Sequence, residues 1–464
     1  MACSVAARKR AGSNYSDQPV THTLRPRQTQ AITDLQRAYS EGARAPVLVA
    51  PTGFGKTATA VDIVRMAWAR GRCVWFLAHL DEILADTANR LEEAGLPFGR
   101  IQPGFDRDYH QQIQVVSVWT AVNRLDLPPA DFIIIDECHL AVAPSYMAVV
   151  ERAGNPFLLG LTGTPQRRDG QPLARLFDRL VLTCSTAELV GEGLLSPVRL
   201  FRPQVSNTMG SAIVGDALEH WQRRCHDRRG VLFCRSVEQA EAVAERWRQA
   251  GYRALAVAGT SPKGQRRAAV DGLRNGDLDA VACVDLWIAG VDIPEISAIS
   301  WLRRTTSLVT WRQGNGRGMR IADGKEDLII HDHANNRHQL GHPLDEPDWS
   351  LEGWAERRPP KAFPVRECPS CYVCLPGGTR ECPECGHEFR IVSRQPQQIA
   401  GELVEDVPSE RPSFNDRRAA ARGFDELVAL GRAHGMVNPE GWARRVMAAR
   451  MVMAARGRKR RVAA

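Results

Sequence analysis

The stretch Ala50-Pro51-Thr52-Gly53-Phe54-Gly55-Lys56-Thr57 decides the fold, because every other informative segment can be interpreted as its partner. It follows the apolar run 47–49 and leads into a segment whose apolar residues recur at helical spacing. A strand, a glycine loop and a helix in this order are the context that a phosphate-binding loop requires. The sequence therefore predicts an α/β domain built around a phosphate site.

The residue types in this loop suit a nucleotide and its metal ion. Gly53 and Gly55 allow the backbone to curl so that successive N–H groups point at phosphate oxygens, and the helix start adds its positive dipole end. Lys56 is expected to neutralise the β- and γ-phosphates of ATP, and the Thr57 hydroxyl to bind Mg²⁺. Ala50 replaces the glycine of the general pattern. The nucleotide contacts expected here are Pro51, Thr52, Gly53, Phe54, Gly55, Lys56 and Thr57.

Composition limits the class of protein. A chain of 464 residues with 44% hydrophobic residues has room for about three domains. No apolar run approaches the ~20 residues of a membrane span, and residues 1–20 carry no secretory signal, so we expect a disordered lead there and no membrane contact. The formal charge of +8 suits a polyanionic partner. Five of the twelve cysteines lie within residues 368–385, which favours a reducing cytoplasm and one metal site.

A second chemical signal follows the apolar run 132–135. Asp136 and Glu137 come directly after this predicted buried strand, and Cys138 and His139 follow them. The carboxyl end of a parallel strand would place both carboxylates beside the phosphate loop. Asp136 is then expected to hold Mg²⁺, and Glu137 to orient and polarise the attacking water. The predicted strand 157–161 ends in Thr162-Gly163-Thr164-Pro165, whose hydroxyls could sense the phosphate site.

The motifs A-x-x-G-x-G-K-T, D-E-C-H and L-T-G-T-P, in this order, resemble the first motor domain of superfamily 2 helicases and translocases. The resemblance implies that Arg25 and Gln28 of the segment Leu24-Arg25-Pro26-x-Gln28 read the adenine, for which an amide offers both a donor and an acceptor. It also implies looser nucleic-acid contacts at His79 and Thr120, although Leu80 stands where the family usually has arginine.

The second half of the chain again alternates predicted strands and helices, and then carries G-V-D-I-P at 290–294 and Q-x-x-G-R-G-x-R at 313–320. These resemble the fifth and sixth motifs of the same family. The resemblance makes Arg317 and Arg320 fingers that stabilise charge on the γ-phosphate, a contribution of about 10³ to 10⁵ in turnover. It also couples Gln313 to His139 across a cleft. The remaining residues that it implies are Asp292 for the nucleotide state and Thr260 for nucleic acid, with Ala289 at a place that is often glutamate.

The pairs Cys368-x-x-Cys371 and Cys382-x-x-Cys385 are ten residues apart. Two such pairs, each presented by a tight turn, make a closed thiolate site for structural Zn²⁺, and the segment resembles a zinc ribbon. Cys374 could replace Cys371, and His387 is a weaker competing ligand. The basic end of the chain is either a solvated tail or a non-specific grip on phosphates. The ribbon or the tail could also bind a protein partner.

We therefore expect an α/β protein with two tandem RecA-like domains, and an enzyme that couples ATP hydrolysis to movement on DNA. The motif set is similar to the DNA-directed branch with restriction-enzyme motor subunits and repair translocases. An RNA helicase and an ATP-gated clamp without unwinding are the alternatives. The expected units are a lead (1–20), RecA-like domains at 21–195 and 196–345, a linker (346–365), the ribbon (366–392), a linker (393–412) and a basic helical tail (413–464).

Overall fold

The computed structural model describes two large parts of the chain and several short stretches after them. The described residues are 24–167, 169–204, 213–284, 293–347, 349–352, 365–367, 370, 374–376, 386–388, 398–408, 420–421, 423–433, 439–444 and 446–447. The predicted lead, Asp292 and the cysteines Cys368, Cys371, Cys382 and Cys385 lie outside them. No helix among the described residues is both long and apolar enough to cross a lipid bilayer.

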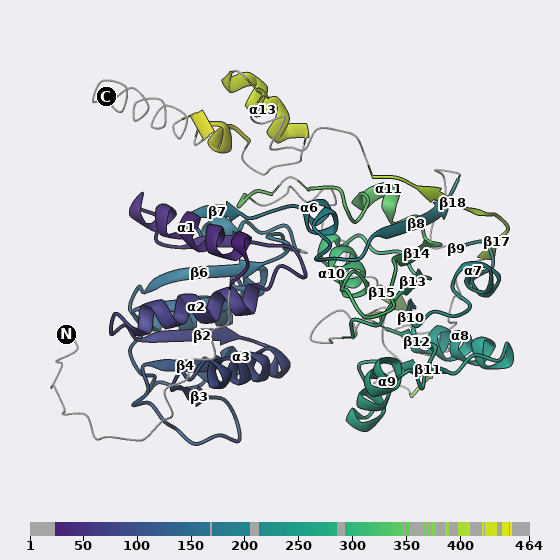
Figure 1. Cartoon of the computed structure of the whole chain (residues 1–464), viewed down its shortest axis with the longest axis horizontal. Coiled ribbons are helices and arrows are strands. Elements are labelled where there is room, and N and C mark those ends of the chain that lie inside the picture. Colours follow the sequence, from purple (N-terminus) through teal and green to yellow (C-terminus); the bar gives the residue numbers. More distant parts are fainter. Residues whose placement is uncertain are drawn as a thin grey trace.

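Two seven-stranded sheets form the framework, as Figure 1 shows, with α6 and α10 between them. The first is parallel throughout and has the order β3-β4-β2-β5-β6-β1-β7. Its strands are β1 (Pro46–Val49), β2 (Val74–Ala78), β3 (Gly99–Ile101), β4 (Ile113–Ser117), β5 (Phe132–Asp136), β6 (Phe157–Thr162) and β7 (Arg179–Leu182). Its helices are α1 (Pro26–Ser40), α2 (Lys56–Trp68), α3 (Asp81–Glu93), α4 (Val118–Ala121), α5 (Pro144–Arg152) and α6 (Thr186–Gly191), with short 3-10 turns η1 (Cys138–Leu140) and η2 (Leu173–Arg175). We call this part, from α1 to α6, the first lobe.

The second sheet has the order β11-β12-β10-β13-β14-β8-β18 and is parallel except for β18. Its strands are β8 (Val198–Pro203), β10 (Gly230–Phe233), β11 (Ala254–Val257), β12 (Ala280–Cys283), β13 (Ala298–Trp301), β14 (Leu328–Asp332) and β18 (Leu403–Asp406). Its helices are α7 (Ala217–Arg224), α8 (Val237–Gln249), α9 (Lys263–Asn275), α10 (Leu308–Gly318) and α11 (Arg337–Leu340). We call these elements the second lobe. The remaining elements are the strand pairs β9 (Ile213–Val214) with β17 (Gln398–Ile399) and β15 (Val365–Glu367) with β16 (Cys374–Pro376), and α13 (Phe424–Ala433). The predicted α/β class with two tandem sheets is confirmed.

The buried strands have few polar residues because helices cover both faces of each sheet. On β2, Val74 and Phe76 pack in one apolar cluster with residues of α1, α2 and α3, whereas Trp75 and Leu77 pack in another with residues of α4 and α5. This alternation follows from the period of two along a strand. The first cluster continues through Leu195 into α9 and α10, so one apolar core joins the two lobes.

Two segments expected to be linkers pack on the lobes instead. Trp349, in the predicted linker 346–365, is 6% exposed and belongs to an apolar cluster of the first lobe. Ala174 N donates to Leu351 O at 2.9 Å, which fixes the same segment. Within the predicted linker 393–412, β18 pairs antiparallel with β8 and buries Leu403. These parts of the linker interpretation are wrong, because buried apolar side chains and ladder hydrogen bonds hold the two segments in place.

Candidate nucleotide site between the two lobes

The loop between β1 and α2 is built on two glycines in the left-handed region. Gly53 has φ +85° and Gly55, the N-cap of α2, has φ +90°. An added Cβ would lie 2.4 Å from Leu195 Cδ2 at Gly53 and 2.4 Å from Gln28 Nε2 at Gly55, so a side chain at either position would displace that group in addition to straining the backbone. The loop therefore ends at the N-terminus of the 13-residue helix α2. The free backbone N–H groups and the dipole of a helix N-terminus favour the binding of an anion there.

Lys56 is half-buried above this loop. Its Nζ donates to Ala50 O at 3.0 Å and lies 3.4 Å from Pro51 O. Burial lowers the pKa of Lys56, the carboxylates of Glu137 and Asp136 oppose this effect, and the charges of Arg317 and Arg320 add to it. The ammonium therefore sits among groups from both lobes, in a place where a phosphate charge would stabilise its protonated form.

The acidic pair stands at the end of β5, as the sequence predicts. Asp136 is 8% exposed, and its Oδ1 accepts from Glu137 N at 2.9 Å. Burial and the neighbouring Glu137 raise the pKa of Asp136. Burial acts in the same direction on Glu137, but the contact with His139 and the charge of Lys56 outweigh it and lower the pKa of Glu137. The two adjacent carboxyls therefore titrate apart, which is typical of groups with different tasks.

Glu137 has a left-handed backbone, with φ 49° and ψ 47°, which is uncommon for a residue with a side chain. Its Oε1 accepts from Gln313 Nε2 at 3.3 Å, and its Oε2 lies 3.3 Å from His139 Nδ1. His139 Nδ1 is also 3.2 Å from Thr162 Oγ1, which accepts from Thr164 N at 3.1 Å. These contacts connect the acidic pair to the segment that follows β6.

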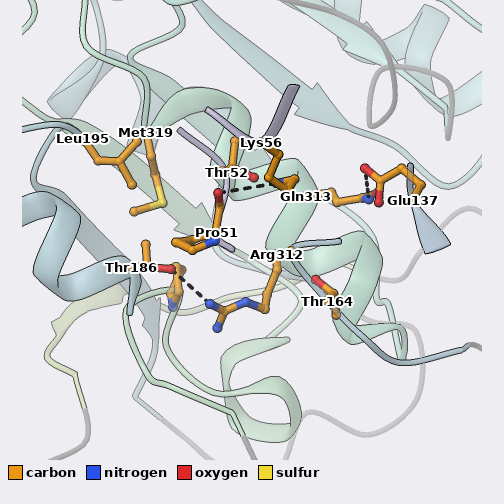
Figure 2. Close-up of a pocket in the computed structure, with 13 residues that line it drawn as sticks. Pro51, Thr52, Lys56, Glu137, Thr164, Thr186, Leu195, Arg312, Gln313 and Met319 are labelled. Atoms are coloured by element: carbon orange, nitrogen blue, oxygen red, sulfur yellow. Dashed lines mark hydrogen bonds between the residues drawn. The ribbon is translucent and has the colours of Figure 1, made fainter. Parts of the chain in front are cut away.

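The second lobe meets this site through α10. A Cβ added to Gly316 would lie 2.8 Å from Thr52 Oγ1, so the helix backbone rests directly on the phosphate loop. Gln313 points to Glu137 in Figure 2, and its amide donates to that residue rather than to His139. The predicted coupling of Gln313 to His139 stays a prediction; in this structure both side chains contact the carboxylate of Glu137, which lies between them. A pocket at this junction is lined by Pro51, Thr52, Lys56, Glu137, Gly163, Thr164, Thr186, Leu195, Arg312, Gln313, Gly316, Met319 and Pro343.

Arg312 lines this pocket, although the sequence interpretation assigned no role to it. Its Nη1 donates to Asp345 O at 2.8 Å and its Nη2 to Thr186 Oγ1 at 3.0 Å, the latter drawn in Figure 2. Its guanidinium also lies 5.5 Å from the ring of Trp349. The signal available in the sequence was its place beside Gln313, but its partners are distant along the chain. Arg317 and Arg320 do not line the pocket, yet their charges act on Lys56.

The side chains predicted to bind adenine form hydrogen bonds to other residues of the chain. Gln28 Oε1 accepts from Arg25 N at 2.8 Å, and its Nε2 donates to Phe54 O at 3.0 Å. Arg25 Nη1 donates to Gly53 O at 3.3 Å. Both residues therefore tie the start of α1 to the phosphate loop. Their contact with adenine stays a prediction.

The three expected nucleic-acid contacts follow parallel strands. His79 follows β2 and its Nδ1 lies 3.4 Å from Tyr146 OH, and burial lowers the pKa of His79. Thr120 is half-exposed in α4, after β4, and Thr260 is exposed after β11. Each lies at the carboxyl edge of its sheet, as the phosphate loop does after β1. Beside Thr120, Trp119 is 60% exposed, a feature that the sequence interpretation missed.

No group of His, Cys, Asp and Glu side chains within the described ranges has the arrangement of a metal site. The four cysteines of the expected ribbon lie outside these ranges, so Zn²⁺ stays a prediction. For Mg²⁺, the chemistry of the site suits the ion: the Thr57 hydroxyl and the Asp136 carboxylate are oxygen donors at the edge of the phosphate loop.

Two protein-family models match this chain, one in each lobe. Residues 21–167 match the family model "Type III restriction enzyme, res subunit", and residues 214–322 match "Helicase conserved C-terminal domain". A 51.5 kDa protein of a Lactococcus phage (isolate 7-9) is 26% identical over 387 residues, covering 79% of this chain and 83% of that protein. A candidate mitochondrial ATP-dependent helicase of Schizosaccharomyces pombe, irc3, is 24% identical over 359 residues, covering 69% of this chain and 59% of its own length.

Among solved structures, the ATP-dependent Type ISP restriction-modification enzyme LlaBIII bound to DNA has a TM-score of 0.50 and 16% identity. The match covers 66% of this chain and 27% of that one, and it shows a shared fold. The chain thus spans less than two thirds of irc3 and of the restriction-modification enzyme.

Proposed function

We propose that this chain, an ATP-hydrolysing superfamily 2 helicase of the restriction-subunit branch with two RecA-like domains, couples hydrolysis to movement along DNA. The observation that carries the proposal is the junction between the lobes. Gln313 of α10 donates to Glu137, and Gly316 of the same helix rests on Thr52 of the phosphate loop. Two lobes that meet on the phosphate loop and the acidic pair can transmit hydrolysis as a change in their separation.

The first lobe would bind and activate the reacting groups. The backbone N–H groups of the loop and the Lys56 ammonium would hold the phosphates of ATP. Thr57 and Asp136 would hold Mg²⁺, which when bound supplies charge neutralisation on the phosphate oxygens. Glu137 would orient the attacking water, because Gln313 and His139 fix its two oxygens and its lowered pKa keeps it ionised.

The second lobe would supply positive charge. We propose that Arg317 and Arg320 stabilise the leaving γ-phosphate, as arginine fingers do in other phosphoryl-transfer enzymes. The effect of both charges on the pKa of Lys56 supports this role, because it requires that the arginines lie near the phosphate loop. Asp292, which lies outside the described residues, would respond to the nucleotide state.

Nucleic acid would lie across the carboxyl edges of both sheets, where His79, Thr120 and Thr260 are found. Contacts there would be mostly to phosphates and therefore weakly sequence-specific and sensitive to salt. The restriction-subunit family model and the DNA-bound structure with the same fold support DNA as the substrate. An RNA substrate and an ATP-gated clamp or recruiter without productive unwinding are the alternatives.

Stimulation of ATP hydrolysis by different nucleic acids tests this proposal. Steady-state rates would be measured with duplex DNA, single-stranded DNA and RNA of matched length, at two salt concentrations. We expect the largest stimulation with DNA and a loss of stimulation at high salt. Stimulation by RNA alone would instead favour the RNA helicase, and tight DNA binding with an unchanged hydrolysis rate would favour the clamp.

We also propose that Cys368, Cys371, Cys382 and Cys385 hold one structural Zn²⁺. The antiparallel pairing of β15 with β16 supports this site, because Cys368 and Cys371 stand between these two strands in the sequence. Metal analysis should find one zinc per chain, and the double change Cys368→Ser with Cys382→Ser should remove it. Full zinc content in that variant would contradict the site.

The boundary between the domains 21–195 and 196–345 is part of this proposal, with β18 (Leu403–Asp406) adding to the second domain a strand from beyond its predicted end. The support for this boundary is that β7 ends at Leu182 and β8 of the other sheet begins at Val198. Free thiols at Cys138 and Cys234, both buried, are compatible with the reducing cytoplasm that we propose as the compartment.

A further inference from the structure

The carboxyl end of α10 is bound by a lysine that belongs to none of the recognised motifs. Lys325 Nζ donates to Gly318 O and to Arg320 O, both at 2.6 Å. It also donates to Pro294 O at 3.0 Å, and so joins the helix end to the segment that follows β12. A helix leaves its last carbonyl oxygens without partners in its own backbone, and here a single ammonium binds two oxygens of that end.

The chain between the lobes binds the same helix end from the other side. Ser196 N donates to Met319 O at 2.7 Å, and Ser196 Oγ donates to Arg320 O at 3.0 Å. The residue before it, Leu195, covers the phosphate loop so closely that a Cβ at Gly53 would lie 2.4 Å from its Cδ2. Leu195 and Met319 both line the nucleotide pocket, where Figure 2 draws them.

We propose that Lys325 is a positioning residue for ATP hydrolysis: its ammonium, together with Ser196, fixes the end of α10 that carries Arg317 and Arg320 relative to the phosphate loop. The inference rests on the proposed function, which assigns those two arginines to the γ-phosphate. Lys325 itself does not touch the pocket in this arrangement.

The chemistry of an ammonium suits this task. It has three N–H donors, and three carbonyl oxygens receive them. A positive charge at the carboxyl end of a helix also interacts favourably with the helix dipole. A turn at Asp323-Gly324, where Gly324 has φ +74°, returns the chain toward the helix end. Burial lowers the pKa of Lys325 to about 7 against the opposing effect of the Glu295 carboxylate, so the ammonium that donates all three bonds predominates below that pH.

Contacts with the first lobe hold the middle of α10, whereas its end packs within the second lobe, where a Cβ added to Gly318 would lie 2.6 Å from Leu328 Cδ1. Gln313 meets Glu137, and Gly316 meets Thr52. Loss of the Lys325 contacts would therefore leave these junctions in place but weaken the positioning of the turn with Arg317 and Arg320. The phosphate loop and Lys56 would be unaffected. The expected consequence is a slower chemical step with little change in ATP binding.

Three variants test this role: Lys325→Met, which keeps the length but removes charge and donors, Lys325→Arg, which keeps charge and donors, and Ser196→Ala. Arg90→Met is the matched control, because Arg90 is a cation in the last turn of α3 and pairs with Asp86 on the surface. The measurements are kcat and KM for ATP, together with hydrogen exchange of the amides at 316–322.

For Lys325→Met we expect kcat to fall at least about tenfold, which corresponds to roughly 1.4 kcal/mol of transition-state stabilisation, with KM within about twofold. Amides at 316–322 should exchange faster. Lys325→Arg should recover part of both properties, Ser196→Ala should show a smaller loss of kcat, and the control should match the wild type.

A kcat within about twofold of wild type for Lys325→Met overturns the proposal, as does unchanged exchange at 316–322. If Lys325→Met does not fold, Lys325→Arg and Ser196→Ala decide the question by the same two readouts. If the proposed function is wrong, DNA will not stimulate ATP hydrolysis by the wild type. Basal kcat and hydrogen exchange would still test the role of Lys325.

Discussion

The close approach of Gly316 to Thr52 gives a sharp test of the closed arrangement, the substitution Gly316→Ala. The added Cβ would lie 2.8 Å from Thr52 Oγ1 and 3.0 Å from Thr52 Cβ. Non-bonded heavy atoms prefer separations of about 3.5–4.0 Å, so α10 and the phosphate loop would have to separate by roughly 0.5–1 Å. Thr52 has a short side chain on a constrained loop and cannot move aside cheaply.

The cost of this change should fall on closure rather than on folding. Overpacking of this kind costs about 1–3 kcal/mol, which would lower the population of closed lobes by about 5- to 150-fold. Within α10 itself, alanine is a better helix former than glycine by up to about 1 kcal/mol. We therefore expect a fall in kcat within that range while the thermal midpoint of the second lobe stays within about 2 °C of wild type.

The assay compares kcat, ATP-analogue affinity and thermal midpoint for wild type, Gly316→Ala and the control Gly191→Ala. Gly191 is the last residue of α6, and an added Cβ there meets nothing within 4 Å. Adding Thr52→Ala to Gly316→Ala removes the tighter of the two contacts and should restore part of the rate. Full activity of Gly316→Ala would refute the view that hydrolysis requires α10 to rest on the phosphate loop.

Three further outcomes are expected. Glu137→Gln should retain ATP binding and lose nearly all hydrolysis, because the amide cannot polarise water; a normal rate would remove Glu137 from this role. Arg317→Ala should cut turnover by about 10³-fold or more and leave analogue affinity within a few-fold, measured by fluorescence titration. His333 is neutral when folded, because burial lowers its pKa to about 4, below the ~6.5 of an unfolded histidine. Its contribution to the free energy of unfolding is complete above pH 6.5 and should be about 2 kcal/mol smaller at pH 5. Urea unfolding at both pH values should show this loss in the wild type and not in His333→Gln.

The local parts of the site could be predicted because each depends on a short stretch of sequence. The apolar run before Asp136 predicts a buried strand, and the carboxyl end of that strand fixes the side on which the acid emerges. Gly53 and Gly55 likewise indicate a loop with positive φ, and both have it. Such signals need only the neighbours in the chain.

The partners of Gln313, Gln28 and Arg312 could not be predicted, since they depend on where distant elements come to lie. Gln313 and Glu137 are 176 residues apart, so the contact exists only once both lobes have folded and met. The side-chain amide of Gln28 can form hydrogen bonds to a ligand or to the chain itself, and the surrounding sequence does not distinguish the two cases. An arginine usually lies at the surface, yet Arg312 donates hydrogen bonds to Thr186 and to the backbone of Asp345.

The strand β18 escaped prediction for a related reason. The stretch 403–406 is short and ends in two acids, which are depleted in strands. Their partners are arginines far away: Arg199 Nε donates to Glu405 Oε1 at 2.8 Å, and Arg202 Nε donates to Asp406 Oδ1 at 2.8 Å. The acids therefore stabilise this edge strand through charges on the neighbouring strand, which a local pattern does not contain.

This strand also decides how the cysteine-containing segment should be removed in experiments. A truncation after residue 352 would take β18 with it, expose the edge of β8 and leave Arg199 and Arg202 without these acids. Loss of the buried Leu403 alone costs about 1.5–3 kcal/mol. Excision of 366–392 with a short polar linker in their place would keep β18 in the chain. We therefore expect the truncation, but not the excision, to lower the thermal midpoint of the second lobe. Equal midpoints would mean that β18 does not stabilise the sheet, and in either case only a loss of activity on the excision could be assigned to the cysteine-containing segment, because the truncation also removes α13 and the basic tail.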